Sequence, residues 1–140
     1  MRVRHVGITV SNMEEALEFY QDFFGFEVVR DMHEEGDHID NFSALKNVSV
    51  RTVKLQDPEG QMIELLHYGS HPRFLHKKDI ADLGCSHFAV TVGNLDEILA
   101  NLAKNGYKPH CEPQLSPDGK VKLTFLPGPD NVLIEMVEEL

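Results

Sequence analysis

The chain has 140 residues, of which 41% are hydrophobic and 26% are charged, so it is long enough to bury the core of one domain. Its formal net charge of −10 disfavours binding to nucleic acid or to an anionic membrane surface, because both are polyanions. A small anionic substrate is still compatible with this charge, since it needs only a local cluster of Lys or Arg. No apolar stretch approaches the ~20 residues of a bilayer-spanning helix.

The beginning of the chain does not have the pattern of a secretion signal. MRVRHVGITV passes directly into alternating apolar and polar residues, without a long apolar run. The cysteines, Cys85 and Cys111, are too few for a disulfide framework. We therefore expect a cytoplasmic protein with reduced thiols.

The first elements of the chain are predicted to be a strand and a helix. Alternation predicts a strand over residues 3–10. Ser11 and Asn12 are typical N-cap residues, and they precede an amphipathic helix over residues 13–24. Gly25 is expected to end this helix.

Three strands are expected after this helix. Residues 30–42, RDMHEEGDHIDNF, predict a polar loop insertion. The last two strands form a hairpin whose turn is DPEG, residues 57–60. Residues 67–84 contain Gly, Pro and mixed charges, which predicts a linker.

The second half of the chain repeats this plan. A strand is expected over residues 86–92, a helix over residues 95–105 that ends at Gly106, and a hairpin with its turn at residues 127–131. Each half is therefore predicted to be a βαβββ module. Together they form one domain over residues 1–140, with module one at 1–66, the linker at 67–84 and module two at 85–140.

The two halves can be aligned without gaps over two stretches. Residues 5–17, HVGITVSNMEEAL, match residues 87–99, HFAVTVGNLDEIL. Residues 55–66, LQDPEGQMIELL, match residues 126–137, LPGPDNVLIEMV. The matched positions that carry chemistry are His5 with His87 and Glu64 with Glu135. A repeat that preserved only a fold would keep apolar residues and turns, so the recurrence of His and Glu indicates a shared function.

These four side chains predict a divalent-metal site. A carboxylate inside an apolar strand costs several kcal/mol without a partner. A pseudo-twofold relation between the modules would bring His5, Glu64, His87 and Glu135 together, and two neutral imidazoles and two carboxylates would balance the charge of M²⁺. Small neighbours on the same strand faces, such as Gly7 and Ala89, leave space in front of the imidazoles.

At these residues the sequence resembles the vicinal oxygen chelate superfamily, which includes glyoxalase I, methylmalonyl-CoA epimerase, extradiol dioxygenases, fosfomycin-modifying enzymes and bleomycin-binding proteins. The resemblance extends from HVGITV to DNVLIEMVE. It implies an α+β fold in which two tandem βαβββ modules, each a half-open sheet with its helix outside, enclose a metal cavity. Members are often dimers, so a homodimer is expected.

The order His-Glu-His-Glu looks like the microbial type of glyoxalase I. It implies a lyase or isomerase that holds Ni, Zn, Co or Mn, less readily Fe, and acts on a small molecule with two adjacent oxygens. In such enzymes a metal-bound Glu moves a proton, and Glu135 is the first choice for this base, with Glu64 second. The places that serve glutathione in that type hold Thr9 and Tyr68 here, so glutathione is not predicted.

Two other functions are consistent with the same residues. The first is a ferrous extradiol-type dioxygenase that uses His5, His87 and Glu135, with Glu64 as a bystander. The second is a non-catalytic protein that sequesters a small molecule, although the complete ligand set argues against it. The remaining histidines are expected at the surface: His33, His38, His67, His71, His76 and His110. The cations on strands that could meet an anionic substrate are Arg51, Lys54, Lys120 and Lys122.

Overall fold

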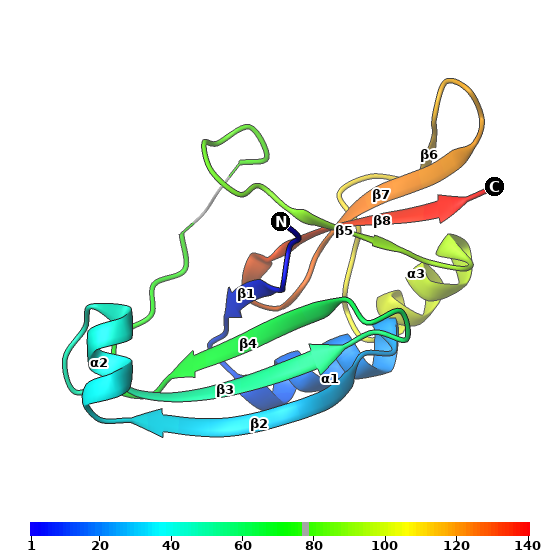
Figure 1. Ribbon diagram of the computed structural model, residues 1–140. Coiled ribbons are helices and arrows are strands. Elements are labelled where there is room, and N and C mark those ends of the chain that lie inside the picture. Colours follow the sequence, from blue (N-terminus) through cyan, green and yellow to red (C-terminus); the bar gives the residue numbers. More distant parts are fainter. Residues whose placement is uncertain (77–78) are drawn as a thin grey trace. The chain divides into compact units, whose positions relative to one another are not determined.

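The computed structural model describes residues 1–76 and 79–140. The chain divides into two compact units, Met1–Phe74 and Leu75–Leu140. Each unit contains a four-stranded mixed sheet, and its main helix contacts that sheet, α1 at β4 and α3 at β8. The ribbon in Figure 1 labels these helices and strands. The structure therefore confirms the predicted α+β fold with two tandem modules.

The first unit has the strand order β1-β4-β3-β2. β1 runs parallel to β4, whereas β3 is antiparallel to both β4 and β2. The elements are β1 (Val6–Thr9), α1 (Met13–Phe24), β2 (Glu27–Glu35), α2 (Asp37–Ser43), β3 (Ser49–Gln56) and β4 (Met62–Tyr68).

The second unit repeats this order as β5-β8-β7-β6. β5 runs parallel to β8, and the other pairs are antiparallel. The elements are β5 (Phe88–Thr91), α3 (Leu95–Lys104), β6 (Gln114–Leu115), β7 (Val121–Pro127), the short helix η1 (Pro129–Asn131) and β8 (Leu133–Glu139).

The main helices begin where the capping residues predict. The Asn12 side chain accepts hydrogen bonds from the backbone N–H groups of Glu14 and Glu15, at 3.1 and 3.2 Å. Gly25 follows α1 with φ 68°, a left-handed conformation that glycine adopts without strain. α1 thus has the predicted bounds, and α3 ends one residue before the predicted end.

The prediction of a polar loop over residues 30–42 was wrong. β2 continues through this segment to Glu35, and α2 follows after Gly36. β2 is an edge strand with polar residues on both faces, so it lacks the alternation that marks a half-buried strand. The first strand of each module is shorter than predicted, and β4 continues to Tyr68, into the segment predicted as a linker. Residues 77–78 of that linker lie outside the described residues.

The core of each unit lies between its sheet and its main helix. On β4, Ile63 and Leu65 are buried on the side of α1, which places Glu64 on the opposite face. The same alternation on β8 buries Ile134 and Met136 and places Glu135 on the other face. Each sheet therefore has an apolar face that packs on a helix and a second face on which the predicted ligands lie.

None of the helices in the described parts of the chain has the length and apolar composition that a bilayer-spanning segment needs.

An ion-pair cluster joins α1 to the sheet of the first unit. The guanidinium of Arg51 on β3 donates two hydrogen bonds to Asp31 on β2, at 3.1 and 2.8 Å, and one to Glu14 on α1, at 2.5 Å. The hydrogen bond from Arg51 holds the pKa of Asp31 below its ordinary 3.8 and that of Glu14 below its ordinary 4.5. The guanidinium of Arg51 is therefore paired with carboxylates on the side of the sheet that packs on α1.

This cluster predicts a pH-dependent contribution to stability. A carboxylate whose pKa is lowered on folding stabilises the fold above its ordinary pKa, and this contribution is lost as the pH falls through the lowered value. Arg51→Met should therefore lower the melting temperature most near pH 7. The difference from the wild type should shrink as the pH falls below 4.5 and then 3.8. Thermal unfolding followed by circular dichroism measures it, and a difference independent of pH would contradict this assignment.

Candidate metal centre

The first unit brings His5 and Glu64 together on the sheet face that α1 does not cover. Gly7 on β1 is the direct partner of Glu64 on β4 in the parallel register. His5 precedes Gly7 by two residues, so its side chain points to the same face. Its Nε2 lies 3.3 Å from Oε2 of Glu64, and both side chains are mostly buried.

The second unit repeats this arrangement. Ala89 on β5 is the direct partner of Glu135 on β8, and His87 precedes Ala89 by two residues. Nε2 of His87 lies 3.2 Å from Oε2 of Glu135. The same parallel register therefore produces the same His–Glu pair twice.

The two pairs differ in the strand beside the glutamate. Lys54 on β3 is the cross-strand partner of Glu64, and its Nζ lies 3.3 Å from the second carboxylate oxygen, Oε1. At the matching place in the second unit, the partner of Glu135 is Phe125 on β7. The Phe125 ring packs edge to face with His87, at 5.0 Å between ring centroids. Glu64 therefore has a cationic neighbour, whereas Glu135 has an aromatic one.

The second ring nitrogens of the two histidines also differ. Nδ1 of His87 lies 2.8 Å from the hydroxyl oxygen of Ser86. If the neutral His87 ring donates its proton through Nδ1, its Nε2 is an acceptor, as is the Glu135 carboxylate that it faces. Nε2 of His87 and Oε2 of Glu135 lie 3.2 Å apart, so these two acceptors require a proton or a cation between them. Nδ1 of His5 is buried and has no hydrogen-bond partner among the described residues. Ser86 thus orients the imidazole of His87, whereas no such hydrogen bond orients the imidazole of His5 among the described residues.

The residues fit a divalent metal in donor type and spacing. Imidazole nitrogen and carboxylate oxygen bind Zn, Ni, Co and Mn. Metal bonds of ~2.1 Å at right angles place neighbouring donor atoms ~3 Å apart. The N–O separations of 3.3 Å in the His5–Glu64 pair and 3.2 Å in the His87–Glu135 pair are close to this value.

Over residues 1–76 and 79–140, no three His, Cys, Asp or Glu side chains are grouped as a metal would need. Each unit supplies two of the predicted ligands, His5 with Glu64 and His87 with Glu135. The convergence of the two pairs on one ion stays a prediction.

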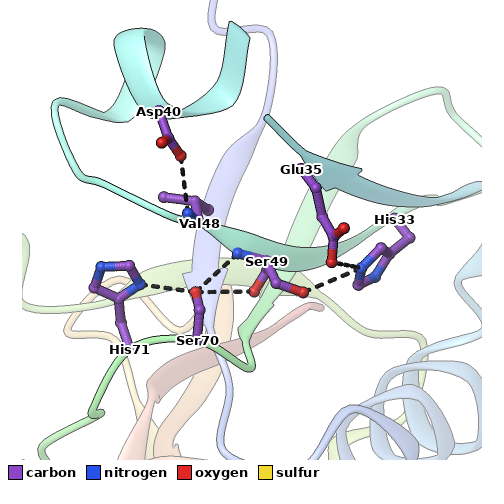
Figure 2. A network of polar contacts seen from close by, with 7 residues as sticks. All are labelled: His33, Glu35, Asp40, Val48, Ser49, Ser70 and His71. Atoms are coloured by element: carbon purple, nitrogen blue, oxygen red, sulfur yellow. Dashed lines mark hydrogen bonds and ion pairs between the residues drawn. The ribbon is translucent and has the colours of Figure 1, made fainter. Parts of the chain in front are cut away.

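A second polar cluster lies at the opposite end of the first sheet, near α2 (Figure 2). His33 Nε2 contacts both Oε1 of Glu35, at 2.9 Å, and the hydroxyl of Ser49, at 3.1 Å. A Ser–His–carboxylate relay needs the hydroxyl and the carboxylate on different ring nitrogens, so this cluster does not have that arrangement. The contact with His33 keeps the pKa of Glu35 low. Ser70, which contacts His71, donates to the Ser49 carbonyl, so the cluster ties strand ends together.

The other predicted histidines and the candidate cations differ in exposure and in their partners. His33, His38, His76 and His110 are exposed, as predicted, whereas His67 and His71 are half-buried. Arg51 is paired on the helix side of its sheet, and Lys122 forms an ion pair with Asp96 of α3. Of the four candidate cations, Lys54 is the one that contacts a predicted ligand.

Comparison with known proteins gives the family. A sequence model of the Glyoxalase/Bleomycin resistance protein/Dioxygenase superfamily matches residues 2–136. Lactoylglutathione lyase of Schizosaccharomyces pombe is 26% identical over 146 residues; the match covers 99% of this chain and 47% of that protein, so the chain spans about half its length. The uncharacterized protein YwkD of Bacillus subtilis is 26% identical over 138 residues, which cover 98% of this chain and 96% of that protein.

A solved structure supports the same relationship at the level of the fold. A glyoxalase family protein from Bacillus cereus superposes with a TM-score of 0.92 at 24% identity, and the match covers 100% of this chain and 95% of that one. The chain therefore belongs to the glyoxalase, bleomycin resistance protein and dioxygenase superfamily. This confirms the resemblance seen in the duplicated His and Glu positions.

The predicted ligands can be tested by metal titration. His5→Ala and His87→Ala should each weaken metal binding by at least ~100-fold, since even loss of an outer-shell partner of a metal ligand costs ~10–100-fold. Calorimetric titration with Zn²⁺ measures the affinity, and elemental analysis measures the bound metal. His110→Ala is the matched control, because His110 is exposed and outside both pairs. Undiminished affinity in both ligand variants would exclude this site.

Proposed function

We propose that the chain is a divalent-metal-dependent enzyme that transfers a proton on a small substrate with two adjacent oxygens, as a glyoxalase I-like lyase or an epimerase or isomerase. The observation that carries the proposal is the duplicated His–Glu pair, with N–O distances of 3.3 and 3.2 Å. The relationship to a lactoylglutathione lyase supports the reaction class. A homodimer in the cytoplasm remains part of the proposal.

The ligands would be His5, Glu64, His87 and Glu135, which would hold Ni, Zn, Co or Mn. When bound, the metal would act as a Lewis acid that stabilises negative charge on an oxygen next to the reacting carbon. The imidazoles would be oriented by their strands, and Ser86 would fix the ring of His87 through Nδ1.

Glu135 is the better candidate for the base that moves the proton. Glu64 is held by the ammonium of Lys54 at 3.3 Å and by His5, so accepting a proton would require this ion pair to be given up. Glu135 has His87 and the uncharged ring of Phe125 as its neighbours. The carboxylate of Glu135 is therefore freer to take a proton from the substrate carbon and return it to a neighbouring atom.

This assignment predicts different effects of two matched variants. Glu135→Gln should lower kcat by at least ~100-fold, the usual contribution of a general base, while KM changes little. Glu64→Gln, loaded with metal to the same extent, should retain more activity. Metal content is measured in each preparation, so that loss of the ion is not read as loss of the base. Wild-type turnover in metal-loaded Glu135→Gln would end the base assignment.

One observation favours a second candidate, the ferrous extradiol-type dioxygenase. Because Lys54 already balances the charge of Glu64, the metal would need only His5, His87 and Glu135. Elemental analysis of protein purified without air separates the two functions. Iron together with oxygen uptake supports the dioxygenase, whereas Ni, Zn, Co or Mn without redox chemistry supports the isomerase or lyase. Thiohemiacetals, acyl-CoA esters and catechols form the substrate panel for both.

A further inference from the structure

The first unit presents an ammonium group beside a predicted metal ligand. Nζ of Lys54 lies 3.3 Å from Oε1 of Glu64, while Oε2 of the same carboxylate faces His5. Lys54 and Glu64 are direct cross-strand partners, so their side chains share the face that α1 leaves uncovered. The side chain of Lys54 is only 21% exposed, so its charge is partly withdrawn from water.

The fold does not require this lysine. The equivalent glutamate in the second unit, Glu135, lies in the same register beside an equivalent histidine, and its cross-strand partner is the apolar Phe125. Among residues 1–76 and 79–140, no ammonium group pairs with Glu135, so the sheet accommodates a carboxylate at this place without a cross-strand lysine. The internal repeat thus serves as a control, and it indicates that Lys54 has a role other than supporting the carboxylate.

A lysine beside a divalent metal site is electrostatically unfavourable unless an anion lies nearby. Two carboxylates and two neutral imidazoles balance M²⁺, and Lys54 adds one uncompensated positive charge. A second cation extends this surface, because Arg30 on β2 is the direct partner of Lys54 and projects from the same face. Glu34 projects from the same face farther along β2, where it keeps its negative charge and accepts a hydrogen bond from Thr52, at 2.9 Å.

We propose that Lys54 binds an anionic oxygen of the substrate, and that the substrate is a small 2-oxo or 2-hydroxy carboxylate. This inference rests on the proposed function, because its charge balance takes both His–Glu pairs to hold one metal ion. Since Lys54 touches Glu64 itself, the anion must lie directly beside the oxygens that chelate the metal. A carboxylate next to an oxygen-bearing carbon supplies both the adjacent oxygens and the charge.

The test measures binding of oxalate, a small dianion with adjacent oxygens, to Zn²⁺-loaded protein by calorimetry at fixed ionic strength. Lys54→Met removes the charge and keeps the length of the side chain, whereas Lys54→Arg keeps the charge. Lys122→Met is the matched control, because Lys122 is also 21% exposed and ion-paired, but to Asp96 of α3 on the helix side of its sheet. Affinity for Zn²⁺ alone is measured for every variant.

We expect Lys54→Met to weaken oxalate binding by ~tenfold or more, and Lys54→Arg and Lys122→Met to change it by less than ~threefold. Zn²⁺ affinity should be unchanged or higher in Lys54→Met, since a like charge has been removed. If Lys54→Met does not fold, as judged by its circular dichroism spectrum, Lys54→Gln replaces it.

Unchanged oxalate affinity in a Zn²⁺-loaded, charge-deleted variant would overturn the role of Lys54 and leave the proposed function standing. Failure of the wild type to bind Zn²⁺, Ni²⁺, Co²⁺ or Mn²⁺ would instead contradict the proposed function, and this inference with it.

Discussion

The parallel pairing of the first and last strands of each unit is the constraint on which the candidate site depends. A parallel register fixes which residue of β1 lies beside which residue of β4, and a shift by one residue would turn Glu64 toward the helix. The same holds for β5 and β8 around Glu135. The faces of the sheets that pack on α1 and α3 carry the buried apolar residues of the core, so the register cannot slip without exposing that core. Packing on one face thus positions the polar pairs on the other.

The fold was predictable wherever local chemistry determines it. Asn12 and Gly25 mark the two ends of α1, which has the predicted length. These ends were predictable because a capping side chain and a left-handed glycine act on backbone groups only a few residues away. The continuation of β2 over residues 30–35 was missed because an edge strand with polar residues on both faces has no alternation to detect. α2 was missed for a related reason, since Ile39 is its one buried residue and provides no periodic apolar pattern.

The His–Glu pairs were predictable because the repeat aligns their residues. Their convergence on one ion stays a prediction, because it depends on how the two units are placed and not on the fold of either unit. The contact of Lys54 with Glu64 was not predictable, because a cross-strand partner is set by hairpin register. Lys54 appeared in the sequence only as one of four candidate cations. Ser86 and His87 are neighbours in the sequence, so their contact could have been suggested from the sequence. A serine next to a histidine is too common, however, to predict a hydrogen bond between them.

The duplicated halves are not equivalent in charge. In the first unit, a single carboxylate contacts an ammonium and an imidazole, whereas in the second unit the carboxylate contacts an imidazole whose ring packs on an aromatic side chain. This difference is consistent with the two proposed roles, in which Lys54 of the first unit binds the substrate anion and Glu135 of the second unit moves the proton. Equivalent backbone positions have thus acquired different chemistry through one cross-strand neighbour in each unit.

The position of Lys54 also bears on how the chain is made. β3 and β4 form a hairpin, so Glu64 acquires its counter-charge as soon as these neighbouring strands pair on the nascent chain. The β7–β8 hairpin, which is synthesised after it, places a phenylalanine beside Glu135 instead. The carboxylate of the earlier half is therefore paired with an ammonium group once its hairpin forms, whereas the hairpin partner of the later carboxylate carries no charge.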